Sequence, residues 1–295
     1  MSGRDCVMSH TVSLTEGVCV LSIEPTEEHL KTCEEAARAG AAVLQSWRGR
    51  FAVSSKGPKD FVTEADLASQ TEIRRLVSAA FPDYGFEGEE TLPDTAAPPA
   101  HTNPLRWVVD PLDGTTNYVH GYPAYCVSVA LADGDRLLAG AIYDPLSNEC
   151  YTARAGHGAW LNGEPMTATT TRDPAESLVA VSFPAHSASE SLAVRDFLAV
   201  LPAVRAIRRS GSSALNLAYL AAGRLDAFWA RRIASWDVAA GLLLVQEAGG
   251  VTAPLIPPGN PQGNPGDSVP LSNPAFIAAG TGELLTALRD MMGKG

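Results

Sequence analysis

The chain has 295 residues, of which 45% are hydrophobic and 19% are charged, and its formal net charge is −11. This length suffices for one large α/β unit or two tightly apposed halves. The sequence contains no uninterrupted apolar run of about 18 residues, so we expect no membrane-spanning helix. The acidic balance, without a basic stripe, argues against nucleic acid as a partner. The five scattered cysteines and the absence of an apolar signal segment predict a reduced, cytoplasmic protein.

The first half of the chain predicts an arm, two helices and a group of strands. Residues 1–25 lack helical periodicity and form an N-terminal arm, either loose or containing an edge strand. Apolar spacing predicts an amphipathic helix over 26–47, and the Thr63–Asp66 signature begins a second helix that stops before Pro82. A surface loop is predicted over 91–103. Apolar runs predict strands at 107–110, 125–132 and 137–143, and turn signals follow at 156–165.

Strand and helix patterns alternate in the second half. The predicted strands cover 178–183, 204–208, 225–229 and 276–279. The predicted helices cover 189–201, 212–222, 238–248 and 283–292, and residues 254–270 read as a loop. This alternation predicts α/β layering. We therefore expect one domain over 26–295, with an N-terminal half to about residue 175 and a C-terminal α/β half from about 176 to 295.

Four segments concentrate carboxylates where a purely structural explanation is strained. They are Glu89 and Glu90 after a strand-like segment, Asp110 and Asp113 leaving an apolar strand, Asp66 at a helix start, and Asp237 before an apolar helix. Taken singly, each has an ordinary explanation as a turn, a helix cap or a favourable charge at a helix N-terminus. Their joint occurrence predicts a site.

Asp110 is the most demanding of these carboxylates. It follows two valines that should be buried, and an ionised carboxylate there is costly unless it is paired or bound to a metal. Magnesium prefers one or two carboxylates per ion, together with water and substrate phosphate. The following Gly114 and Thr115 can open a short helix whose free backbone N–H groups bind an anion. The segment thus predicts a metal beside a phosphate.

These motifs resemble those of a known family. Residues 110–117 match the D-P-x-D-G-T-x-N signature of inositol monophosphatase-like proteins, and residues 236–250 match the second signature, W-D-x-A-A-G…E-A-G-G. Residues 60–66 and 88–90 match two upstream elements of the family. From about residue 28 onward, the chain resembles this magnesium-dependent, lithium-sensitive phosphatase family. The resemblance implies a layered α-β-α-β-α sandwich and a homodimer.

The resemblance also implies which residues hold Mg²⁺. A first ion would be bound by Glu89, Asp110 and the backbone carbonyl of Leu112. A second ion would be bound by Asp110, Asp113 and Asp237, and a third, weaker ion by Glu89 and, through water, Asp66. The implied cofactor is therefore two to three Mg²⁺ ions, with Li⁺ as an inhibitor.

Other residues acquire catalytic and substrate-binding roles by the same resemblance. Glu89 and Thr115 would orient and deprotonate the attacking water, supported by Glu90 and Asp66. The amides of Gly114 and Thr115 would contact the phosphate, and Lys56 would lie on a loop that closes near the site. Metal-activated water would attack phosphorus in line, without a covalent intermediate.

The part of the chain that would select the substrate departs from the inositol monophosphatases. Those enzymes carry a substrate-binding glutamate seven residues before the signature aspartate, where this chain has Ala230. Arg231 and Arg232 either meet a second anionic group or are solvated residues at a strand end. Ser212 and Ser213 are candidates for contacts with a sugar or polyol hydroxyl.

Two classes of function follow. The first is a phosphatase of a small phosphate ester: inositol monophosphate, or histidinol phosphate, a sugar phosphate such as fructose bisphosphate, or a 3′-phosphonucleotide. The second is a regulatory protein that has kept the fold but lost turnover. The complete set of predicted ligands favours the phosphatase.

Overall fold

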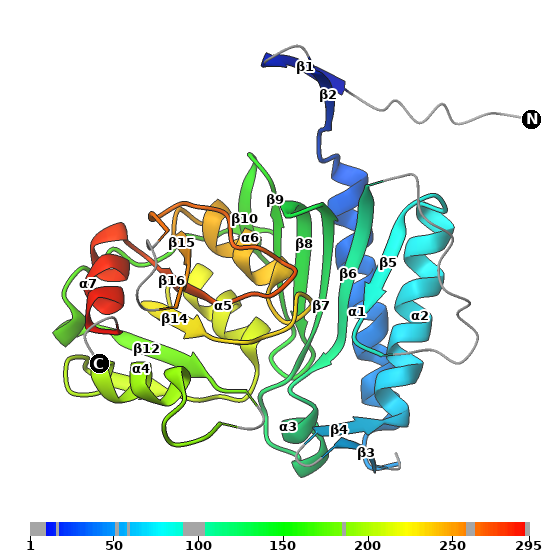
Figure 1. The fold of residues 1–295 in the computed structure, drawn as a ribbon. Helices are drawn as coiled ribbons and strands as arrows, with labels where there is room; N and C mark the ends of the chain where they lie inside the picture. Colours follow the sequence, from blue (N-terminus) through cyan, green and yellow to red (C-terminus); the bar gives the residue numbers. More distant parts are fainter. Residues whose placement is uncertain are drawn as a thin grey trace, which may run out of the picture.

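A computed structural model describes residues 10–15, 18–50, 53–57, 60–90, 104–184, 187–257 and 263–292 (Figure 1). Side chains are described from residue 23 onward, apart from 51–62. The loop predicted over 91–103 and the first nine residues of the predicted arm lie outside these residues.

Two helices begin the folded body, and each starts with a capping box. In α1 (Glu27–Trp47) the Thr26 hydroxyl accepts from the His29 amide, and His29 Nδ1 accepts from the Thr26 amide at 3.0 Å. In α2 (Glu64–Ala80) Thr63 and Asp66 make the same reciprocal pair. These bonds satisfy amides that have no partner within the helix. Both predicted helices are confirmed.

A mixed sheet of seven strands lies against this helix pair, in the order β11-β10-β9-β8-β7-β6-β5. Its strands are β5 (Gly85–Gly88), β6 (Leu105–Asp113), β7 (Cys126–Asp133), β8 (Arg136–Asp144), β9 (Glu149–Arg154), β10 (Gly158–Leu161) and β11 (Glu164–Pro165). Only β5 and β6 pair in parallel. Alternate residues of β6 enter different cores: Val109 packs with α1 and α2, and Val108 packs on the opposite face.

The second sheet contains five strands in the order β13-β12-β14-β16-β15. They are β12 (Leu178–Ser182), β13 (Ala206–Arg208), β14 (Ala227–Ala230), β15 (Val251–Pro254) and β16 (Phe276–Ala279). The remaining helices of the body are α3 (Thr115–His120), α4 (Leu192–Val200), α5 (Ser213–Ala221), α6 (Ala239–Glu247) and α7 (Gly282–Met292), with a short 3-10 turn at Pro174–Glu176.

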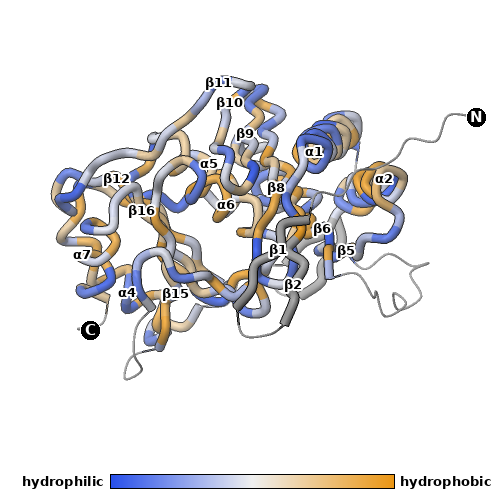
Figure 2. Tube along the Cα trace, turned by 90° about the horizontal axis from the view of Figure 1, so that it is seen from above, coloured by the Kyte–Doolittle hydropathy of each residue, from blue (hydrophilic) through white to orange (hydrophobic). Residues whose placement is uncertain are grey.

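The elements stack in five layers. Seen from above, α1 and α2 lie outside the first sheet, α5 and α6 lie between the two sheets, and α4 and α7 cover the outer face of the second sheet (Figure 2). The cores follow this order, because Phe228 of β14 packs toward α5 and α6 whereas Trp229 packs toward α7. The predicted α-β-α-β-α sandwich is confirmed. No helix in the described part of the chain is long and apolar enough to cross a membrane.

The structure adds strands that the sequence reading did not separate. The region 11–23 forms a two-stranded antiparallel sheet, β1 (His10–Thr15) with β2 (Val18–Ile23), rather than one edge strand. A second small sheet pairs β3 (Val53–Gly57) with β4 (Asp60–Thr63). Strands β9 and β15 were not predicted, and β10 and β11 lie where only turns were predicted. Short strands depend on pairing with distant neighbours, so local patterns identify them poorly.

Gly241 determines how closely α6 packs on α5. A Cβ on Gly241 would lie 2.5 Å from Leu217 Cβ. We expect Gly241→Ala to lower the free energy of unfolding by about 1–3 kcal/mol, because neither backbone can move away without disturbing the layer between the sheets. Urea denaturation measures this. Gly282→Ala, at the start of α7 with only ordinary contacts, is the control and should be neutral or slightly stabilising.

Buried His29 makes stability depend on pH. Burial lowers its pKa from 6.5 to about 4, so the folded state resists protonation more than the unfolded state does. The stabilising contribution is complete above pH 6.5 and is lost as the pH falls toward 4. We expect His29→Gln, which can retain the capping box, to flatten the decline between pH 7 and pH 5 by about 1–2 kcal/mol. Equal declines in urea titrations of both proteins would contradict this assignment.

Candidate active site

Three aspartates from two elements meet at one point. Asp110 and Asp113 come from β6, and Asp237 lies just before α6. Each offers a carboxylate oxygen within 4.8 Å of the others. Pairing of β6 with β7 shifts register between Asp110 and Asp113, and the Leu112 amide donates to Asp110 Oδ1 at 2.9 Å. This irregularity in the strand allows both aspartates to contribute to one cluster.

The electrostatics of the cluster fit a cation. Burial, followed by the charges of Glu89, Asp113 and Asp237, raises the pKa of Asp110 well above its usual range. Burial and neighbouring carboxylates also raise the pKa of Asp237 to about 8. Among the described residues, none hydrogen-bonds to the buried Oδ2 of Asp110. An oxygen-rich, unsatisfied and mutually repelling set of this kind suits a hard divalent cation.

Asp113 is held by the beginning of α5. Its Oδ2 accepts hydrogen bonds from the Ser212 hydroxyl and, at 2.7 Å, from the Ala214 amide, and its Oδ1 accepts from the Ser213 amide at 3.3 Å. These bonds oppose the effect of burial, although the pKa of Asp113 is still raised. The Ser212 hydroxyl therefore orients a carboxylate and also caps α5, and it does not line the cavity described below.

A second group of polar side chains joins α2 to α3. The Thr115 hydroxyl lies 3.1 Å from the Leu112 carbonyl and 3.3 Å from Asp66 Oδ1. Asp66 is fully buried and accepts from both the amide and the hydroxyl of Thr63. The structure thus brings Thr115, Asp66 and the Leu112 carbonyl together, and their roles stay predictions. Gly114 begins α3 with φ 96°, and a Cβ there would lie 2.8 Å from the Ala124 carbonyl, so this turn requires glycine.

Glu89 and Glu90 follow β5 at the edge of the same region. Gln70 of α2 binds both backbone groups of Glu90, donating to its carbonyl at 2.6 Å and accepting from its amide at 2.9 Å. The Glu89 amide donates to the Val109 carbonyl at 3.2 Å. The Glu90 side chain is buried, whereas Glu89 lines the adjoining cavity. Of the two glutamates, Glu89 is thus the one that lines the cavity, and the catalytic roles of both stay predictions.

A cavity of about 440 Å³ opens beside the cluster. Its walls combine acidic residues with residues of the second sheet and its loops: Glu89, Asp113, Asp237, Phe183, Pro184, Arg209, Ser213, Ala230, Arg231, Arg232 and Trp236 are among them. Of the predicted substrate residues, Ser213 and Arg231 line this cavity. Lys56 lies in β3, and its side chain falls outside the described residues.

Two residues of the signatures that had no predicted role hold distant segments together. The side-chain Nδ2 of Asn117, at the end of the first signature, donates to the Ala124 carbonyl at 2.6 Å and to the Ser210 carbonyl at 2.9 Å. Glu247 of the second signature accepts from the amides of Gly156 and Gly158 at 2.7 and 2.8 Å. Their presence within the motifs was the available signal. Both act as cross-links between distant segments rather than as ligands.

Comparison with known proteins agrees with this geometry. The model of the inositol monophosphatase family matches residues 26–283. The inositol-1-monophosphatase of Rhizobium meliloti is 41% identical over 199 residues, covering 67% of this chain and 73% of that protein. The Nus factor SuhB of Xylella fastidiosa is 40% identical over 199 residues, covering 67% and 70%.

Solved structures are similar over most of the chain. The extragenic suppressor protein SuhB from Bartonella henselae superposes with a TM-score of 0.78 at 33% identity, covering 90% of this chain and 98% of that one. The inositol monophosphatase of Anabaena gives a TM-score of 0.73 at 32% identity, covering 90% and 95%. The predicted class, a phosphoric monoester hydrolase, is confirmed at the level of the family. Because the family model, the fold and the acidic cluster agree, we conclude that the chain belongs to the inositol monophosphatase family.

Proposed function

We propose that this protein is a Mg²⁺-dependent phosphatase that hydrolyses a phosphate monoester of a small metabolite. The observation that carries the proposal is the Asp110–Asp113–Asp237 cluster, in which Asp110 and Asp113 are buried and Asp237 is half-buried. The raised pKa values of these aspartates and the unsatisfied oxygen of Asp110 call for a cation beside a cavity of ligand size. Glu89 and the Leu112 carbonyl would complete the ligand set. Bound Mg²⁺ would neutralise phosphate oxygens and lower the pKa of the attacking water.

In this reaction, different residues of the chain position the attacking water, accept its proton and bind the phosphate. Glu89 lines the cavity and accepts a proton from the attacking water. The Thr115 hydroxyl, placed between the Leu112 carbonyl and Asp66, orients that water. Asp66 is fixed by Thr63, so the Thr115 hydroxyl keeps one direction. The start of α3 at Gly114 and Thr115 presents backbone amides to the phosphate.

An inositol monophosphate is one candidate substrate, in line with the names of the Rhizobium and Anabaena relatives. Ala230 lies in the cavity wall and has no group that binds a hydroxyl. The other esters named above therefore stay as alternatives. The homodimer, the cytoplasmic location and inhibition by Li⁺ stay predictions from the sequence.

A regulatory role is a second candidate. It is favoured by relatives named Nus factor SuhB, from Xylella fastidiosa at 40% identity and from Salmonella typhimurium at 37% identity. Retention of all the predicted carboxylates supports turnover in this chain. Binding of RNA at physiological salt, without hydrolysis of any ester in a Mg²⁺-containing assay, would favour the regulatory role.

Replacing one ligand tests the metal-dependent reaction. We expect Asp110→Asn to lower kcat/KM for phosphate esters at least about 100-fold, because Asp110 is proposed to bridge two ions. Release of inorganic phosphate, with Mg²⁺ or with EDTA, measures this. Asp83→Asn makes the same chemical change at an exposed position and should keep activity. Turnover that survives either EDTA or Asp110→Asn would exclude the mechanism.

Restoring the missing glutamate tests the substrate. We expect Ala230→Glu to raise kcat/KM for inositol 1-phosphate about tenfold or more relative to glycerol 2-phosphate, because a carboxylate in this wall can accept bonds from ring hydroxyls. Wild type and variant are compared on both esters. If the ratio of the two rates does not change, Ala230 is not the position that selects the substrate.

A further inference from the structure

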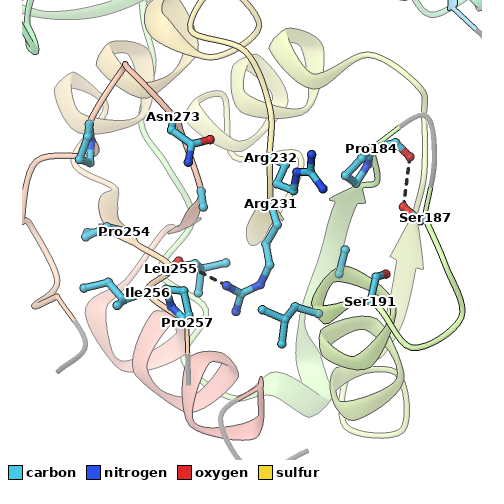
Figure 3. Close-up of a pocket in the computed structure, with 14 residues that line it drawn as sticks. Pro184, Ser187, Ser191, Arg231, Arg232, Pro254, Leu255, Ile256, Pro257 and Asn273 are labelled. Carbon is cyan, nitrogen blue, oxygen red and sulfur yellow. Dashed lines mark hydrogen bonds between the residues drawn. The ribbon is translucent and has the colours of Figure 1, made fainter. Parts of the chain in front are cut away.

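A second cavity adjoins the candidate active site. Its volume is about 530 Å³, and it lies among the two arginines that follow β14, the start of α4 and the segments around Pro254–Pro257 and Asn273 (Figure 3). Pro184, Arg231 and Arg232 line both this cavity and the one beside the carboxylates. The two spaces therefore share a wall. A molecule with its phosphate at the carboxylates would have to pass these three residues to reach the second cavity.

The second cavity differs chemically from the first. Among its described lining residues none is acidic, and most are apolar: Pro184, Leu192, Ala193, Leu255, Pro257 and Ala275 are examples. The first cavity carries three acidic residues and three arginines. An apolar cavity with few polar groups favours an apolar group over a polyol, because transfer of apolar surface out of water is favourable.

Arg231 does not turn the second cavity into an anion site. Its Nε donates to Asp196, and its Nη1 donates to the Leu255 carbonyl at 3.3 Å. Both side chains of the ion pair are almost fully buried, with exposed fractions of 9% and 2%. The charge is thus compensated within the protein, so Arg231 supports the wall instead of attracting a second phosphate.

Arg232 marks the boundary between the cavities. Its φ of 56° is left-handed, which is uncommon for a residue with a side chain. Figure 3 shows the consequence: Arg231 extends toward Leu255, whereas Arg232 points away from it, toward Pro184. The Arg232 side chain is exposed and borders both spaces. A planar guanidinium in this position can stack on a ring that passes between them.

We propose that the second cavity is a leaving-group subsite, and that the substrate carries a ring-sized apolar or aromatic body at a distance from its phosphate-bearing carbon. This inference rests on the proposed phosphatase function. Water would split the P–O bond at the carboxylates, giving inorganic phosphate and the alcohol, while the ring of the alcohol occupies the apolar cavity. The substrate class is then an extended phosphate monoester rather than a compact polyol phosphate.

Ala275 and Ala193 allow the subsite to be filled without touching the reaction centre, because they line only the second cavity. The probes are phenylalkyl phosphates of increasing linker length, with glycerol 2-phosphate as the compact ester. We expect wild-type kcat/KM to rise with linker length to an optimum. Ala275→Leu should lower it about tenfold at that optimum and leave glycerol 2-phosphate within about twofold. Ala193→Leu should do the same.

Ala42→Leu, on the exposed face of α1, is the matched control and should change neither ester. Absence of a linker-length optimum in the wild type, or equal losses on both esters in the two cavity variants, would overturn the subsite. Failure of the wild type to hydrolyse any of these esters with Mg²⁺ would instead overturn the proposed phosphatase. Hydrolysis of glycerol 2-phosphate therefore separates the two failures.

Discussion

Repulsion among three closely spaced carboxylates is the constraint on which the centre of this molecule depends. Asp110, Asp113 and Asp237 lie within a few ångströms, and burial raises their pKa values. Each is held by donors of the chain: the Leu112 amide, the start of α5 and the Ala234 amide. Because these donors come from separate segments, the fold must be assembled before the charges can be kept together. In the proposed function, a bound cation would offset the charge and the unsatisfied oxygen that the protein alone leaves.

The five layers supply those donors. The middle layer consists of α5 and α6, which come from the C-terminal half of the chain. The start of α5 nevertheless binds Asp113, at the carboxyl end of β6 in the first sheet. The Asn117 side chain also links the two halves of the chain, because it donates a hydrogen bond to the Ser210 carbonyl. The site therefore lies where the two halves meet. The N-terminal half contributes most of the proposed ligands, and the C-terminal half contributes Asp237 and much of the cavity wall.

This division separates the reaction from its selectivity. The residues proposed to hold the metal and the water lie on strands and helix starts that hydrogen bonds between side chains and the backbone keep in place. The cavity walls instead come from strand ends and loops, where Ala230, Arg231 and Arg232 follow one another. Adjacent arginines have different roles because one is paired with Asp196 and the other has a left-handed backbone. Selectivity can then change without disturbing the carboxylates.

The sequence by itself determined the family, the main helices and the carboxylates of the site, because these depend on local periodicity, caps and spacing within short motifs. It could not determine the short strands β9 and β15, whose pairing partners are distant, or the role of Ser212, which the proximity of Asp113 decides. Tertiary structure alone placed Gln70 on the backbone of Glu90 and paired Arg231 with Asp196. Tertiary structure also formed the two adjoining cavities, because residues from several distant segments line each of them.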